Sequence, residues 1–241
     1  MSFVTPNSPI SFYPASALRS RAGNPQVQAG VQPSGIPTLA SPPADLVSLN
    51  TSFAARIAAE QTYNQQQRAR VSQASVNLAR TLGLPPERQA LVGLAAQYYN
   101  AGKDPAANPL WVKSGPLASD EVLQMQQYPL ASVNQLIAAS ATKRSQGLTA
   151  EADQLDQAIP IVLTHKYQAA GGGYPAQTII GPQIPIEAQI LGLVDAYYAM
   201  TAPRPYRPAP MSPEAALQTI QAESGSKWDP RLVAAFTRKS A

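Results

Sequence analysis

Few side chains in this sequence could do chemistry, and two of them lie in its C-terminal half. His165 is the only histidine of the 241 residues, and Asp195 lies inside an apolar helical pattern. Imidazole and carboxylate groups are common ligands of iron, manganese and related metals. A lone histidine near a helix end is more often structural than ligating, and a buried aspartate needs a partner whatever its role. A chemical and a structural interpretation therefore stay open for both side chains.

Composition excludes several classes of site. The chain has no cysteine, which rules out a disulfide framework, a thiolate zinc site and a cysteine nucleophile. The net charge of +4 fits a mild attraction to phosphate-bearing ligands. No segment combines dense basic residues with aromatic ones, so we expect no nucleic-acid binding. We also expect no membrane span and a cytoplasmic protein, because no apolar run approaches ~18 residues and no standard secretory signal is present.

Apolar residues recur at helical spacing, and strand signals are poor, so the pattern predicts an all-α protein. Proline followed by an acidic residue suits a first helical turn, and Ser119, Ser212 and Asp229 are candidate N-caps. We expect Pro160 to kink its helix. The expected helices cover 45–82 (one helix, or two joined near 61–70), 85–101, 119–128, 131–145, 149–167, 185–200, and two more beginning near 213 and 230.

The N-terminal segment differs from the rest of the chain. Residues 1–44 are rich in Pro, Ser, Gly and Gln and contain no acidic residue. Such a composition cannot bury enough apolar surface to offset the entropy of ordering. We therefore predict a disordered tail at 1–44 and one all-α domain at 45–241. A docking role for the tail stays open.

In its order of motifs the chain resembles the HD-GYP family, which are metal-dependent phosphodiesterases that open cyclic di-GMP. The resemblance covers roughly residues 67–236, and the C-terminal half carries the specific match. It implies an HD-domain-like helical bundle with the C-terminal extension of that family. The matching segments are Lys113-Ser114-Gly115-Pro116-Leu117, Gly173-Tyr174-Pro175, Ile184-Pro185 with Asp195, Arg204-Pro205-Tyr206-Arg207, Ser212-Pro213-Glu214 and Trp228-Asp229-Pro230.

The resemblance also implies that most metal ligands of the family are replaced here. His165 and Asp195 match two ligand positions. The other ligand positions are occupied by Gln67, Tyr99, Asn100, Tyr128, Lys166, Ala170 and Tyr198. Lys166 would add positive charge beside a dication, an opposition of about 4 kcal/mol at ~4 Å with an effective dielectric near 20. We therefore expect a degenerate site without metal, in which Lys166 pairs with Asp195 and replaces the metal's charge. Tyrosines, in turn, would fill the vacated space.

The residues suited to binding ligand phosphates match the family pattern better than the residues at the metal-ligand positions do. Lys103, Arg204 and Arg207 fall at positions near the family's site, and guanidinium groups bind phosphate in a bidentate manner. The tripeptide Gly173-Tyr174-Pro175 is the family signature, in a loop implicated in contacts with diguanylate cyclases. The alternative is that packing and helix capping alone hold the turn at Arg204–Arg207.

Three functions remain in competition. The favoured one is a catalytically degenerate protein that binds cyclic di-GMP or a signalling protein such as a diguanylate cyclase. The second is a working phosphodiesterase with a reduced site that still uses iron, manganese or a similar metal. The third is a scaffold without nucleotide binding. Tyr99 and Asn100 occupy the positions of the family's His-Asp pair. Their presence favours the first or third function over an enzyme, and enzymatic activity stays open as the second.

Overall fold

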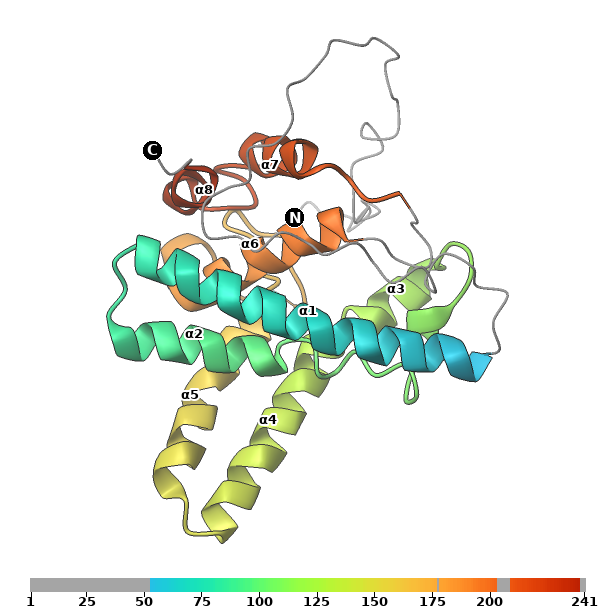
Figure 1. Cartoon of the computed structure of the whole chain (residues 1–241), viewed down its shortest axis with the longest axis vertical. Helices are drawn as coiled ribbons and strands as arrows, with labels where there is room; N and C mark the ends of the chain where they lie inside the picture. The colour runs from blue at the N-terminus through green and yellow to red at the C-terminus, as the bar shows by residue number, and fades with distance from the viewer. Residues whose placement is uncertain (1–52, 177, 203–208, 239–241) are drawn as a thin grey trace, which may run out of the picture. The chain divides into compact units, whose positions relative to one another are not determined.

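The computed structural model describes residues 53–176, 178–202 and 209–238, and this part of the chain is all-α, as predicted (Figure 1). It contains no β-strand among the residues described. The helices are α1 (Phe53–Thr81), α2 (Pro86–Tyr98), α3 (Ser119–Met125), α4 (Tyr128–Ser145), α5 (Thr149–Thr164), α6 (Ile186–Thr201), α7 (Pro213–Ala222) and α8 (Pro230–Thr237), with short 3-10 turns η3 (Pro109–Val112) and η4 (Gly181–Gln183).

Helix α1 is continuous, so the possible break near residues 61–70 is wrong. The polarity of that segment is the reason why two joined helices were considered. Two of its polar side chains, Asn64 and Gln67, are in fact buried and face the interior. Val71 and Leu78 continue the same buried face at helical spacing. Tertiary contacts of the polar side chains therefore keep the segment helical.

Helix α6 forms the centre of the fold. It packs against α1, α2, α5 and α7. Because it is covered on several sides, apolar residues occupy nearly its whole circumference, as expected for a buried helix. Its buried apolar side chains are Ala188, Ile190, Leu191, Leu193, Val194, Tyr197, Tyr198 and Met200.

Backbone contact at Gly192 brings α6 against the end of α5. A side-chain carbon at Gly192 would lie 2.1 Å from the backbone oxygen of His165. No side chain fits in that space, and backbone atoms cannot move aside as a flexible side chain can. Gly192 thus places Asp195, about one turn further along α6, beside the residues that follow α5.

Helices α4 and α5 form an antiparallel hairpin (Figure 1). The turn between them contains Gly147 with φ of 77°, a left-handed conformation that favours glycine. Helix α4 begins at Tyr128, earlier than predicted, because Pro129 is tolerated in a first turn. Helix α5 continues through Pro160 and ends at Thr164, so the predicted end near residue 167 is too late.

Two of the three predicted caps are confirmed. The Ser212 side chain accepts a hydrogen bond from the backbone N–H of Ala215, and Asp229 accepts one from that of Arg231. Ser119 instead is the first residue of α3. There the Glu121 carboxylate accepts a hydrogen bond from the backbone N–H of Ala118, so an acidic side chain still closes the turn.

Three predictions concern residues outside the described part of the chain. They are the disordered tail at 1–44, the start of the first helix at 45–52, and the arginines at 204 and 207. Of the helices that the structure describes, none has both the length and the apolar character needed to cross a membrane.

Substitution of Gly192 by alanine tests the close approach of α5 and α6. We expect Gly192→Ala to lower the free energy of unfolding by about 3 kcal/mol, because the helices must separate. The matched control is Gly93→Ala in α2, where the added carbon meets only the Val76 and Ser72 side chains. That variant should stay within about 1 kcal/mol of wild type. Chemical denaturation measures both, and equal effects would contradict the proposed contact.

Candidate functional site

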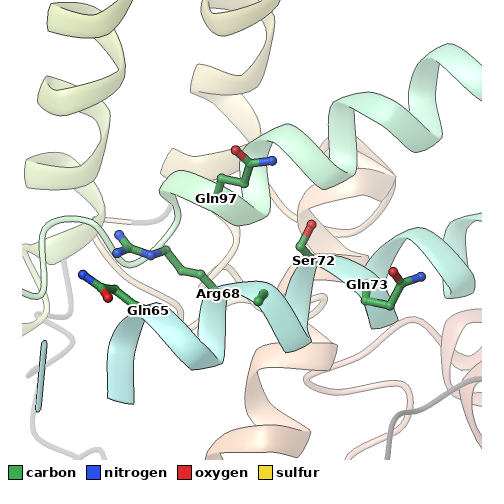
Figure 2. A pocket seen from close by; sticks show the side chains of 6 residues that line it. Gln65, Arg68, Ser72, Gln73 and Gln97 are labelled. Carbon is green, nitrogen blue, oxygen red and sulfur yellow. The ribbon is translucent and has the colours of Figure 1, made fainter. Parts of the chain in front are cut away.

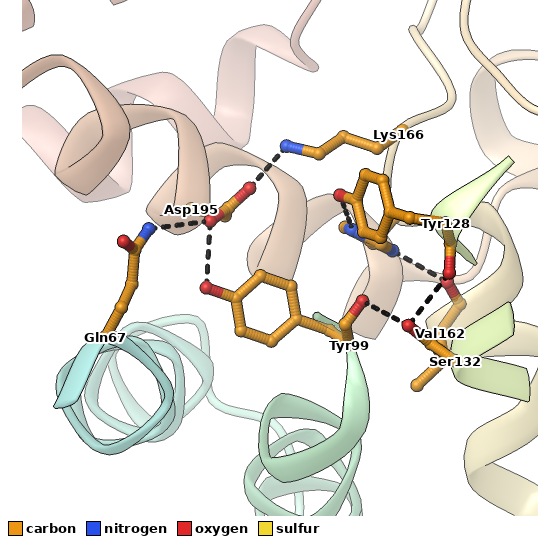
Figure 3. A network of polar contacts seen from close by, with 8 residues as sticks. Gln67, Tyr99, Tyr128, Ser132, Val162, Lys166 and Asp195 are labelled. Carbon is orange, nitrogen blue, oxygen red and sulfur yellow. Dashed lines mark hydrogen bonds and ion pairs between the residues drawn. The ribbon is translucent and has the colours of Figure 1, made fainter. Parts of the chain in front are cut away.

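The carboxylate of Asp195 is the centre of a buried polar network (Figure 3). Its Oδ1 atom accepts hydrogen bonds from Gln67 Nε2 at 3.1 Å and from the Tyr99 hydroxyl at 2.9 Å. Its Oδ2 atom forms an ion pair with the Lys166 ammonium. Both oxygens are thus engaged by side chains of the protein.

The three donors come from separate elements. Gln67 lies on α1, Tyr99 follows α2, and Lys166 follows α5. Each occupies a position where the family resemblance implied a lost metal ligand, and the structure brings all three to one carboxylate. The predicted pairing of Lys166 with Asp195 is confirmed.

Charge explains why Asp195 stays ionised although it is buried. Burial alone would raise the pKa of this carboxyl. The ammonium groups of Lys166 and Lys103 act in the opposite sense and hold the pKa well below its usual range. The positive charges of the two lysines thus compensate the negative charge of the buried carboxylate.

His165 is buried beside this carboxylate and has different partners. Its Nδ1 atom lies 2.7 Å from the backbone oxygen of Val162, and its Nε2 atom lies 2.7 Å from the Tyr128 hydroxyl. Because a carbonyl can only accept, we assign the proton to Nδ1, and Nε2 then accepts from Tyr128. Burial, followed by the nearby Lys166 charge, lowers the pKa of His165 to about 3, so the imidazole is neutral.

Aromatic rings surround the ammonium of Lys103. Its Nζ atom lies 4.4 Å from the ring centroid of Tyr128, 5.7 Å from that of Tyr99 and 5.8 Å from that of Trp111. These are cation–π distances. Lys103 thus contributes a second positive charge next to a single carboxylate. Trp111 was not identified in the sequence, where an isolated tryptophan in a loop gives no signal.

Ser132 fixes the loop that carries Lys103. Its hydroxyl accepts from the backbone N–H of Gly102 at 2.8 Å and lies 3.1 Å from the Tyr99 carbonyl oxygen. A side-chain carbon at Gly102 would lie 2.3 Å from the backbone oxygen of Tyr128. The loop after α2 is therefore in backbone contact with α4. Ser132 was not predicted from the sequence, because a serine within a helix gives no signal of such a role.

The remaining predicted site residues lie in different surroundings. Asn100 is buried, donates to the backbone oxygen of Asn64 at 3.3 Å, and has a buried carbonyl oxygen without a hydrogen-bond partner. Tyr174 of the Gly173-Tyr174-Pro175 loop has its ring in edge contact with Tyr128, with centroids 6.2 Å apart. This loop therefore borders the network.

The donor atoms do not suit a catalytic metal cluster. Among the described residues, no group of three or more His, Cys, Asp or Glu side chains is placed to hold a metal ion. Both Asp195 oxygens and both His165 nitrogens already have partners within the protein. A dication would also face the Lys166 ammonium at the same carboxylate.

A separate hollow of about 500 Å³ lies between α1 and α2 (Figure 2). Its walls are mostly polar amide and hydroxyl groups. None of its lining residues belongs to the Asp195 network, and Arg68 is the basic one. The lining residues are Gln65, Arg68, Ala69, Ser72, Gln73 and Gln97.

Comparison with known proteins defines the family. Residues 51–232 match the family model of the HD domain, so the chain belongs to this family. It is 31% identical over 169 residues, 70% of its own length, to the cyclic di-GMP phosphodiesterase response regulator RpfG of Xanthomonas campestris, covering 41% of that protein.

Two further relatives are also named as cyclic di-GMP phosphodiesterases. One, from Vibrio cholerae, is 31% identical to this chain in an alignment that covers 64% of this chain and 30% of the relative. The other, from Thermotoga maritima, is 28% identical in an alignment that covers 70% of this chain and 42% of the relative. With its Gly173-Tyr174-Pro175 motif, the chain is an HD-GYP-like member of the family. It spans less than half the length of each of these relatives.

Removal of the Lys166 charge tests the network. Lys166→Met would leave a carboxylate that is 2% exposed without its cation, so we expect a loss of about 3 kcal/mol in unfolding free energy. Lys143→Met is the control, since its pair with Glu151 is exposed and should be worth less than about 1 kcal/mol. The double variant Lys166→Met with Asp195→Asn should recover most of the loss. Equal effects of the two single variants would contradict this.

Acid should destabilise the protein through His165. The imidazole has a pKa of about 3 in the folded protein, whereas its ordinary pKa, which applies to the unfolded chain, is 6.5. The unfolded state therefore binds the extra proton, and stability that is present above pH 6.5 is lost as the pH falls toward 3. We expect His165→Gln to reduce the slope of unfolding free energy between pH 6 and 4 by about 1.36 kcal/mol per pH unit. Denaturation at a series of pH values measures it, and parallel slopes would refute the assignment.

Proposed function

We propose that this chain is a non-hydrolytic HD-GYP-like protein that binds cyclic di-GMP in second-messenger signalling. One observation carries the proposal: the Asp195 carboxylate is held by Lys166, Gln67 and Tyr99. The site therefore keeps a closed network of side chains where hydrolysis would need ligands for metal ions. A cytoplasmic location is part of the same proposal.

The donor set argues against hydrolysis. Metal-assisted cleavage of a phosphodiester needs at least one ion that activates water and neutralises the phosphate. To bind here, an ion would have to displace hydrogen bonds from Asp195 and compete with a fixed ammonium. Tyr128 would not compensate, because burial raises the pKa of its hydroxyl well above its usual value, so it stays protonated. A metal-dependent phosphodiesterase with a reduced site is therefore the weaker candidate.

Surplus positive charge supports binding of an anion. Lys103 and Lys166 carry two charges beside the single carboxylate of Asp195, and His165 is neutral. Trp111 and Tyr174 are only partly buried at the edge of this cluster, and aromatic rings of this kind stack on nucleobases. Phosphate charge and base stacking are the two properties that a cyclic dinucleotide offers. The names of the relatives support this choice of ligand.

A protein partner is also compatible with the proposal. The loop around Gly173-Tyr174-Pro175 borders the site, and Ile180 near it is 54% exposed. A diguanylate cyclase remains the partner that the family resemblance suggests. Such a partner would contact the same edge of the protein as the ligand.

Calorimetry with cyclic di-GMP and a hydrolysis assay with added manganese or iron test the proposal together. We expect binding without turnover. Lys103→Met should weaken binding by about tenfold or more, because a charge-assisted contact to phosphate is lost. Lys113→Met is the matched control, since this exposed lysine pairs with Glu121 outside the site, and it should bind as wild type does.

Two results would overturn the proposal. Stoichiometric metal with turnover would make the protein a phosphodiesterase. Absence of both binding and turnover would leave a scaffold that uses only the fold.

A further inference from the structure

The outer face of α4 is exposed and carries no charge. From Tyr128 to Thr142 the helix contains no charged side chain. Two of its large apolar side chains are exposed, Leu130 by 42% and Ile137 by 50%. Solvent-facing helix surfaces normally carry charged residues, so this surface is suited to contact with another protein.

The exposed residues of this face follow the spacing of a coiled-coil seam. Leu130, Asn134, Ile137 and Ala141 are separated by four, three and four residues, as alternating d and a positions are. All four are exposed. We call these four residues the α4 seam.

We propose that the α4 seam binds the α4 seam of a second copy of this chain, in an antiparallel two-fold dimer. A two-fold interface sets each surface against itself, so a charged patch would repel its own copy. The α4 seam has no such charge. This inference concerns a surface outside the Asp195 network and goes beyond the proposed ligand.

Charge and size favour the antiparallel arrangement. In a parallel pair the charged ends of the two hairpins, at Lys143 and Arg144, would lie side by side with like charges facing each other. In the antiparallel pair they lie at opposite ends of the interface. The antiparallel register also sets Leu130 of one protomer opposite Ala141 of the partner subunit, a large side chain against a small one.

Neighbouring charges do not compete with this contact. Lys143 is paired with Glu151 of α5, and Arg144 with Asp153 and Asp156. The charged end of the hairpin is therefore engaged within the chain. The small residues Ala131 and Ala138, both exposed beside the seam, let a second helix approach closely.

Sedimentation velocity over a range of concentrations tests the dimer. We expect wild type to associate and Ile137→Lys to raise the dissociation constant by about 100-fold, because the two-fold interface contains the change twice. Ile180→Lys is the control, with a similar exposure of 54% but no place in the seam, and it should associate as wild type does. A monomeric wild type, or an Ile137→Lys variant as dimeric as wild type, would overturn the proposal.

Cysteine cross-linking tests the orientation independently, since the chain has no native cysteine. Residues 130 and 141 lie roughly 16 Å apart along one helix, too far for a bond within one chain. Mild oxidation should yield a covalent dimer of Leu130→Cys/Ala141→Cys, and neither single variant should cross-link. A parallel seam would cross-link the single variants, and that result, or no cross-linking at all, would overturn the antiparallel pair.

Discussion

The interior of this protein depends on one buried carboxylate. Asp195 is buried, and a carboxylate without partners at that depth would be too costly to keep ionised. Its partners are Gln67 on α1, Tyr99 directly after α2 and Lys166, the second residue after α5. The middle of α1 and the residues that follow α2 and α5 must therefore meet α6 at one point, and the polar residues inside α1 are explained by that requirement.

Backbone contacts determine where that point lies. The carbonyl of His165 touches α6 at Gly192, and the Tyr128 carbonyl touches the loop at Gly102. Such contacts leave no room for adjustment, since backbone atoms cannot change rotamer. Ser132 adds hydrogen bonds across the second contact. Together they hold Tyr99, Tyr128 and His165 close enough to form one hydrogen-bonded and aromatic cluster rather than separate core residues.

The sequence predicted the helices of the C-terminal half well, because proline, acidic and capping residues mark where α7 and α8 begin. It predicted α1 less well, since local polarity near Gln67 hid a tertiary partner far along the chain. The same limit applies to the site. The pairing of Lys166 with Asp195 followed from the charges of matched positions. The rings around Lys103 and the role of Ser132 depend on folded geometry, which local spacing does not encode.

Charge balance explains why binding and hydrolysis place opposite demands on this site. A catalytic dication is held by several anionic or neutral ligands that leave its charge available to the substrate. Here one carboxylate faces two ammonium groups, so the surplus charge is positive before any ligand arrives. That surplus attracts phosphate and repels a dication. Under the proposed function, the lysines that bind the phosphodiester are therefore the same residues that prevent its cleavage, because they repel the metal ion that cleavage needs.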